Sequence, residues 1–193
     1  RMNTCLCLPW MARLVTLVLL GSLLALAGDP PLGAVRFEGR IVVEPSGDAH
    51  SAYRFDLAII DYKAVRERSA DPRRVLQPTL DLRSDRESSP DTSFRFEDAA
   101  TAIVAELHEL GAARSTGGGA WELRVPASCD LVTWKTEGDS VSAWLYAVGQ
   151  TSFALPFRGP VEVRLPVGSS GVSWNDATHA LRWSRASANG GTG

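Results

Sequence analysis

Short stretches in which apolar and polar residues alternate recur along the chain, and they constrain its fold more than any other feature. Val35–Val43 reads VRFEGRIVV and Pro160–Leu165 reads PVEVRL, so each has one apolar and one polar side. A period of two is typical of strands that bury one face. Further strands are predicted within Ala52–Tyr62, Ala120–Val125, Leu131–Lys135, Val141–Val148, Ser152–Phe157, Val172–Trp174 and Ala180–Trp183. Tight hairpin links are expected at Gly149–Gln150 and Asn175–Thr178.

One segment has helical rather than alternating spacing. Residues 98–110 read DAATAIVAELHEL, with Asp98 as a candidate cap and Gly111 directly after the last apolar residue. Its apolar side chains recur at helical spacing, at Ile103, Leu107 and Leu110. Many short strands with frequent turns favour a sandwich or a barrel. The predicted fold class is therefore α+β: a mostly antiparallel β-sandwich or barrel-like domain with one inserted helix at about 98–110.

The stretch from Lys63 to Ser93 differs in character from the predicted strands. It contains Pro72, Pro78 and Pro90 among charges of both signs. Prolines and mixed charge are common at sheet edges and in surface loops. We expect a solvated excursion with a short edge strand around Val75–Leu76 and Leu80–Leu82. A loop that binds a partner is the alternative.

The N-terminal part of the sequence has the features of a secretory signal. Arg13 precedes the apolar run Leu14–Ala27 (LVTLVLLGSLLALA), which ends in Ala25-Leu26-Ala27. A positive residue, a short apolar run and a small-x-small end are the three parts of a signal peptide, so cleavage is expected before Gly28. The predicted organisation is a signal peptide over 1–27, one β-rich domain over 28–186 and a disordered tail over 187–193. An uncleaved membrane anchor and a buried helix are the alternatives for the apolar run.

Charge and cysteine content exclude some classes of protein. A net charge of −2 argues against a nucleic-acid-binding protein, which would carry a basic stripe. Cys5 and Cys7 precede the predicted cleavage point, so Cys129 would be the one cysteine left. A single thiol forms no intramolecular disulfide, and the domain must therefore be held by its core. We expect no membrane span after cleavage.

Motifs for metal, cofactor or nucleophilic chemistry are not found in the sequence. His50, His108 and His179 do not lie at ligand spacing, and neither H-E-x-x-H nor C-x-x-C occurs. His108 is expected in the last turn of the predicted helix, and His50 and His179 are expected in exposed turns. The alternative for His50 and His179 is that they form a composite metal site together. No G-x-S-x-G occurs, and Gly168–Gly171 reads as a turn. We predict no catalytic residues, no metal and no cofactor.

Tryptophans are the most informative side chains of the second half of the chain. Five of the six lie on predicted strands, at Trp121, Trp134, Trp144, Trp174 and Trp183. Tryptophan dominates both cores and interfaces. Most are expected in the core, including at least one of Trp174 and Trp183. Where exposed, the candidates for ligand binding are Trp174, Trp183, Trp144 and Tyr146, with a glycan or a protein as partner.

These observations favour an exported, extracytoplasmic β-rich domain that acts as a binding or envelope-associated module. A secreted hydrolase with a carboxylate pair and a purely structural envelope component are the alternatives. An exposed aromatic row would favour binding, and a deep pocket with converging acids or histidines would favour catalysis.

Overall fold

The computed structural model describes residues 35–76, 92–125 and 128–185. The predicted signal peptide, the tail over 187–193 and the strand expected at Leu80–Leu82 lie outside these ranges. Within the described ranges, no helix has the length and apolar character needed to cross a membrane.

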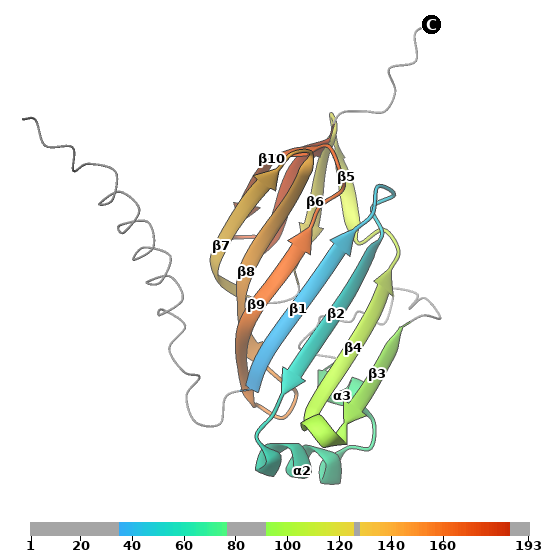
Figure 1. The fold of residues 1–193 in the computed structure, drawn as a ribbon, viewed down its shortest axis with the longest axis vertical. Helices are drawn as coiled ribbons and strands as arrows, with labels where there is room; N and C mark the ends of the chain where they lie inside the picture. Colours follow the sequence, from blue (N-terminus) through green and yellow to red (C-terminus); the bar gives the residue numbers. More distant parts are fainter. Residues whose placement is uncertain (1–34, 77–91, 126–127, 186–193) are drawn as a thin grey trace, which may run out of the picture. The chain divides into compact units, whose positions relative to one another are not determined.

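Most strands belong to one seven-stranded sheet (Figure 1). In spatial order it contains β3 (Ser93–Glu97), β4 (Ala102–Glu109), β2 (Ala49–Asp56), β1 (Val35–Val43), β9 (Pro156–Arg164), β8 (Ser140–Gln150) and β7 (Ser128–Glu137). A four-stranded sheet contains, in order, β10 (Ser169–Asn175), β11 (Ala180–Arg185), β6 (Ala120–Arg124) and β5 (Ala113–Gly117). Among the described strands, every pairing is antiparallel except that of β1 with β9.

One hydrophobic core joins the two sheets. The alternating residues of β1, Val35, Phe37, Ile41 and Val43, are buried, and they share this core with Leu181 and Trp183 of β11. Their polar neighbours along β1 point to the opposite face, as the period of two requires. The prediction of a mostly antiparallel β-sandwich with a small helical part is confirmed.

The two helices lie where the sequence predicted the end of the strand within Ala52–Tyr62 and the surface excursion that follows it. α2 (Ile59–Arg68) and α3 (Pro72–Leu76) follow β2 directly. α2 buries Tyr62 and Val65, and α3 buries Val75 and Leu76. The strand expected over Ala52–Tyr62 is therefore only partly correct, since β2 ends at Asp56, and the edge strand expected at Val75–Leu76 is a helical turn.

The helix predicted at 98–110 is wrong. Asp98–Ala100 forms a single 3-10 turn, Thr101 adopts a left-handed conformation at φ 50°, and Ala102–Glu109 forms β4. β4 pairs along its whole length with β2 and over five residues with β3. Ile103 and Leu107 are four residues apart, and residues at this separation lie on the same face of a helix and also on the same face of a strand. Tertiary pairing decides between the two.

Two predicted boundaries are also wrong. Gly149–Gln150 is the end of β8 rather than a hairpin turn, and the connection to β9 runs through residues 151–155. Of the strand expected at Ser152–Phe157 only Pro156 and Phe157 are in a strand, and they are continuous with the strand expected at Pro160–Leu165, as β9. The hairpin at Asn175–Thr178 is confirmed: it joins β10 to β11, and the Thr178 N–H donates to Asn175 Oδ1 at 3.2 Å.

The parallel pairing of β1 with β9 joins the N-terminal strands of the large sheet to its C-terminal strands. Gly159 on β9 lies against β1 so closely that a Cβ there would be 1.6 Å from the Phe37 carbonyl oxygen. Beside this contact, the Phe37 ring packs against Phe55 at 4.8 Å and Phe157 at 5.0 Å between centroids. Glycine is required at position 159 because the obstructing atoms belong to the backbone, which has no rotamer to change.

We expect Gly159→Ala to destabilise the protein by about 3 kcal/mol or more, because β1 and β9 must separate to admit the methyl group. Gly39→Ala is the graded comparison, since its Cβ would be 3.0 Å from Val161 Cγ2 and 3.1 Å from Tyr53 Cδ1, which are side-chain rather than backbone atoms. Chemical denaturation of both variants measures the difference. Equal stability of Gly159→Ala and the wild type would contradict the close approach.

Candidate functional site

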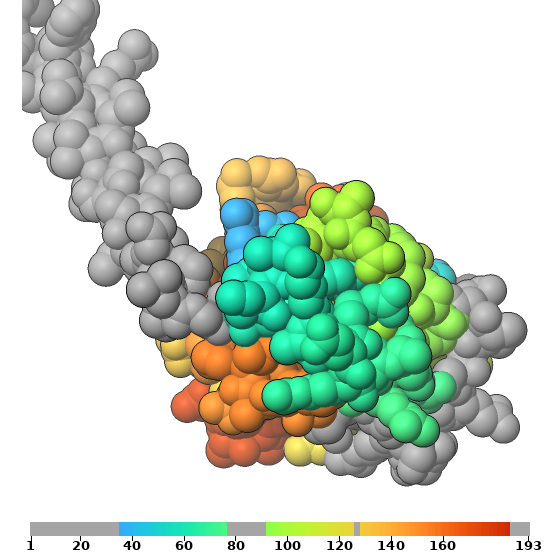
Figure 2. All heavy atoms as spheres, turned by 90° about the horizontal axis from the view of Figure 1, so that it is seen from below, coloured from blue at the N-terminus to red at the C-terminus, as the bar shows by residue number. Residues whose placement is uncertain are grey.

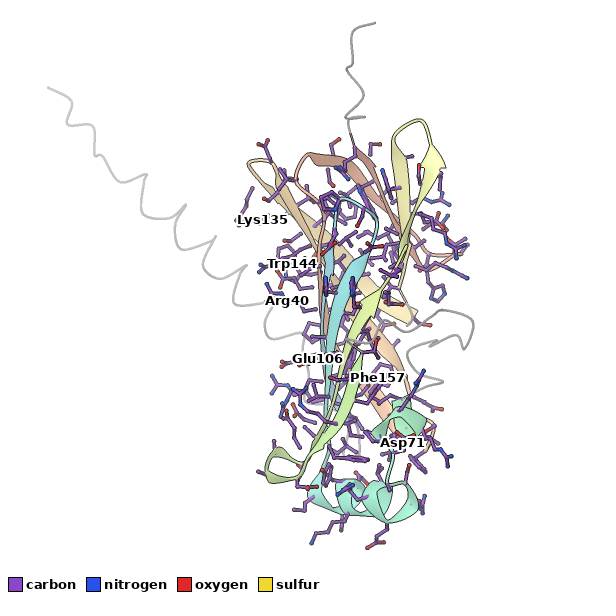
Figure 3. All side chains as sticks on the ribbon, turned by 90° about the vertical axis from the view of Figure 1, so that its right-hand side faces the viewer. Arg40, Asp71, Glu106, Lys135, Trp144 and Phe157 are labelled. Atoms are coloured by element: carbon purple, nitrogen blue, oxygen red, sulfur yellow. The ribbon has the colours of Figure 1, made fainter. Side chains whose placement is uncertain are left out.

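The outer face of the seven-stranded sheet, the face turned away from the core, is polar and crosses all seven strands. The paired residues Thr133, Trp144, Glu162, Arg40, Ala52, Glu106 and Ser93 form one row across it. Directly paired residues project to the same side of a sheet. Figure 3 shows Lys135, Trp144, Arg40 and Glu106 along one side of the sheet. This outer-face row is the candidate site.

An aromatic pair lies at the β8 position of the outer face. Trp144 has 39% of its surface exposed, and Tyr146, two residues further along β8, is half-buried. Their neighbours on β8, Ala143, Leu145 and Ala147, are buried on the other face. Packing in the core therefore holds the strand that presents the two rings.

Charged side chains continue the row from Trp144. Glu162 is paired in register with Trp144, and its carboxylate lies 2.8 Å from Arg164 Nε and 3.8 Å from Arg40 Nε. A carboxylate and two guanidinium groups thus lie directly beside an exposed indole ring. These groups supply hydrogen-bond acceptors and donors next to an apolar surface.

A hollow of about 390 Å³ lies at the other side of Arg40. It is lined by Arg40, Val42, His50, Ser51, Ala52, Glu106, Leu107 and His108. The register explains the hollow: the small side chain of Ala52 lies between the long side chains of Arg40 on β1 and Glu106 on β4. The structure thus places a recess in the middle of the sheet's outer face.

Two histidines form one wall of the hollow. His50 on β2 and His108 on β4 are directly paired, and their rings stack with centroids 4.1 Å apart and planes 13° apart. His50 Nε2 is 3.0 Å from Glu44 Oε1. The predictions that His108 lies in a helix and His50 in a turn are both wrong, because β4 and β2 carry them to this wall. His179 lies in the β10–β11 hairpin, at φ 50°.

A chain of ion pairs holds Glu106 at the opposite wall. Arg95 bridges Glu106 at 3.0 Å and Glu97 at 3.3 Å, and Arg54 bridges Glu97 at 2.7 Å and Asp56 at 2.8 Å. The Arg54 guanidinium lowers the pKa of Glu97 through its hydrogen bond to that carboxylate. Because each arginine bridges two carboxylates, the linked network orients these side chains more firmly than isolated surface pairs would.

The other two candidate residues lie elsewhere. Trp183 is only 2% exposed, and Trp174 is partly buried against the same core, with its Nε1 donating to Asp176 Oδ1 at 3.3 Å. The burial expected for at least one of the two is thus observed. Trp174 pairs with Leu181, so these tryptophans face inward from the small sheet, while Trp144 and Tyr146 face outward from the large one.

The sequence analysis did not single out several of the site residues. Arg40, Glu106 and Glu162 have no motif around them, and only the strand register brings them into one row. Within the described ranges, no group of three or more His, Cys, Asp or Glu side chains is arranged to hold a metal ion. Burial raises the pKa of the Cys129 thiol to about 11, which makes it a poor nucleophile at neutral pH.

Asp48 stabilises the rim next to the histidine pair. Its Oδ1 accepts the Gly111 N–H at 2.7 Å, and its Oδ2 accepts the Ser46 hydroxyl at 2.9 Å. These hydrogen bonds, the Gly111 one above all, lower the pKa of Asp48 from its ordinary 3.8. The Gly111 contact connects the β1–β2 turn to the β4–β5 turn.

The Gly111 amide should report this interaction as the pH falls. A carboxylate whose pKa is lower in the folded than in the unfolded protein stabilises the fold at pH values above its unfolded-state pKa. This stabilisation is lost as the pH falls through its folded-state pKa. We therefore expect the Gly111 amide proton shift to titrate with a midpoint below 3.8. In Asp48→Asn this titration should disappear. A wild-type midpoint at or above 3.8 would contradict the hydrogen bond.

No protein-family model, curated protein or solved structure matches the chain.

Proposed function

We propose that this protein is an exported binding module that recognises a glycan on the outer face of its seven-stranded sheet. The observation that carries the proposal is the row from Trp144 through Glu162 and Arg40 to the hollow at Ala52. Adjacent strands are about 4.8 Å apart, so this row is roughly 14 Å long. It fits an extended oligosaccharide lying across the strands.

The chemistry of the row matches that of a sugar chain. A pyranose ring has an apolar face of C–H groups, which stacks on an exposed indole, and a rim of hydroxyl groups, which need donors and acceptors. Trp144 offers the stacking surface, and Glu162, Arg40 and Arg164 offer the polar partners. Rigid aromatic anchors surrounded by oriented polar groups are the usual energetic centres of recognition sites.

The carboxylates of the row favour binding over hydrolysis. Glu162 and Glu106 lie three strand spacings apart, roughly 14 Å, whereas glycosidases hold their two carboxyl groups about 5–10 Å apart. Glu162 is engaged by Arg164 and Glu106 by Arg95, both at hydrogen-bond distance. A purely structural component would have no need of an exposed indole on the same face as a recess.

Trp144→Ala tests the proposal directly. An array of neutral and acidic oligosaccharides, followed by calorimetry on each ligand that binds the wild type, measures affinity. Loss of a stacked ring should weaken binding by about 1–3 kcal/mol, which is about 5- to 150-fold. The melting temperature should not change, because Trp144 is a surface residue.

Trp134→Ala is the matched control. Trp134 is 47% exposed and lies on the neighbouring strand β7, but it pairs with buried Ala143 and so projects to the opposite face of the sheet. Its substitution should leave affinity unchanged. Equal losses in the two variants, or an array on which the wild type binds no oligosaccharide, would contradict glycan recognition by the outer face.

Export is the second part of the proposal, and it rests on the apolar run Leu14–Ala27 and its Ala25-Leu26-Ala27 end. N-terminal sequencing of the protein recovered outside the cytoplasm should begin at or near Gly28. A mature product that retains Leu14 to Leu24 would show that the run is kept as an anchor.

A further inference from the structure

The large sheet ends on one side in β7, a long strand with exposed side chains (Figure 1). β7 has ten residues, and among the described strands it pairs with β8 alone. All of its side chains except Cys129 and Val132 are exposed. The free side of an edge strand presents backbone N–H and C=O groups to which another strand can pair. β7 is therefore a place where the sheet can be extended.

The opposite edge of the same sheet is protected. β3 has only five residues, and α3 contacts it, with the Arg73 guanidinium carbon 5.7 Å from the centroid of the Phe94 ring. Figure 2, seen from below, shows the teal atoms of α2 and α3 against the light green of β3 and β4. Short length and a covering helix are common means by which a protein keeps a sheet edge from pairing with another chain. β7 is twice as long as β3 and contains no proline.

Two large apolar side chains are exposed on β7, one on each face. Leu131 is 56% exposed on the outer face, where it pairs with Tyr146. Trp134 is 47% exposed on the inner face, where it pairs with Ala143, and it is not among the residues of the core that joins the two sheets. A strand added beside β7 would cover both side chains, because it would place residues directly opposite them.

The apolar residues of β7 are self-complementary in an antiparallel pair. A register shift at Asp130 leaves β7 regular from Leu131 onward. When Thr133 lies opposite Thr133 of a second copy, Val132 lies opposite Trp134 on the inner face, and the two-fold symmetry forms this contact twice. Cross-strand pairs of an aromatic with a β-branched residue are among the stabilising ones.

The charges of β7 agree with this register. Leu131 lies opposite Lys135 of the second copy, and no two like charges oppose each other. Lys135 is ion-paired with Glu137 of its own strand, so its charge is compensated and its aliphatic stem can pack on Leu131. A register centred on Trp134 would place Leu131 opposite Glu137, and one centred on Lys135 would place two ammonium groups opposite each other.

We propose that two copies of this chain associate through their β7 edges, antiparallel and centred on Thr133, to form one continuous sheet across both copies. The two-fold axis is perpendicular to the sheet, so the outer faces of the two copies lie on the same side. Thr133 is the end of the outer-face row, and the two rows therefore meet end to end. The pairing covers neither row, so the affinity of a single row for a short oligosaccharide does not depend on it, and the association does not rest on glycan binding.

Disulfide trapping tests the association in the full chain carrying Cys5→Ser, Cys7→Ser and Cys129→Ala. Directly opposed residues of an antiparallel pair have Cα atoms about 4.5–5.5 Å apart, which is within the range of a disulfide. In glutathione buffer, Thr133→Cys should therefore form several-fold more covalent dimer than Thr136→Cys. Thr136 is the matched control: it is an exposed threonine of the same strand, but in this register it lies about 20 Å from its own symmetry mate.

Mixed variants test the register. Leu131→Cys and Lys135→Cys should crosslink with each other several-fold more than either does with itself. In the Thr133→Cys chain, Trp134→Ser should reduce the covalent dimer several-fold, whereas Trp144→Ser, which removes a similarly exposed indole on β8, should not. Neither serine substitution should change the melting temperature, because both indoles are at the surface.

Clustering through another part of the chain would raise crosslinking at positions 133 and 136 alike, so equal crosslinking at the two positions would overturn the proposal. A Thr133→Cys chain that stays monomeric at the highest concentration reached would also overturn it, and would leave the β7 edge to a different partner. Crosslinking at 133 that is insensitive to Trp134→Ser, or self-crosslinking of Lys135→Cys that exceeds its crosslinking with Leu131→Cys, would overturn the pairing centred on Thr133.

Discussion

The close approach of β1 to β9 at Gly159 is the constraint on which the rest of the structure depends. It joins strands β1 to β4 to strands β7 to β9 in one sheet, because no other pairing among the described strands connects the two groups. Without a Cβ at Gly159, the β9 backbone can contact the Phe37 carbonyl, and the rings of Phe37, Phe55 and Phe157 close over the inner side. Closing a parallel pair between segments more than 100 residues apart costs more chain entropy than closing a local hairpin, and the close packing along this pair offsets that cost.

The same seam aligns the proposed glycan site. Glu162 on β9 and Arg40 on β1 are partners across it, and they link the aromatic half of the outer-face row to the hollow. A change of register by one residue would turn Arg40 into the core and Gly39 outward. The buried residues of the inner face therefore determine the recognition surface on the outer face, although none of them would touch a ligand.

Much of the sandwich could be predicted from the sequence, since VRFEGRIVV and PVEVRL alternate without interruption and the hairpin after Trp174 has ordinary turn chemistry. Prediction failed where two periods coincide, because Ile103 and Leu107 suit a helix and a strand equally. The β-branched Ile103 and Val104 favoured the strand. The inward direction of Trp183 could be predicted, because Trp183 shares a strand face with the apolar Leu181 two residues before it. The row itself could not be predicted, because it depends on pairings between residues as distant as Arg40 and Glu162, which no local pattern encodes.

The outer-face row depends on the rigidity of the sheet that carries it. The five inner strands of the large sheet, β4, β2, β1, β9 and β8, are each paired on both sides. The side chains of the row therefore keep a fixed spacing, which suits oriented hydrogen bonds.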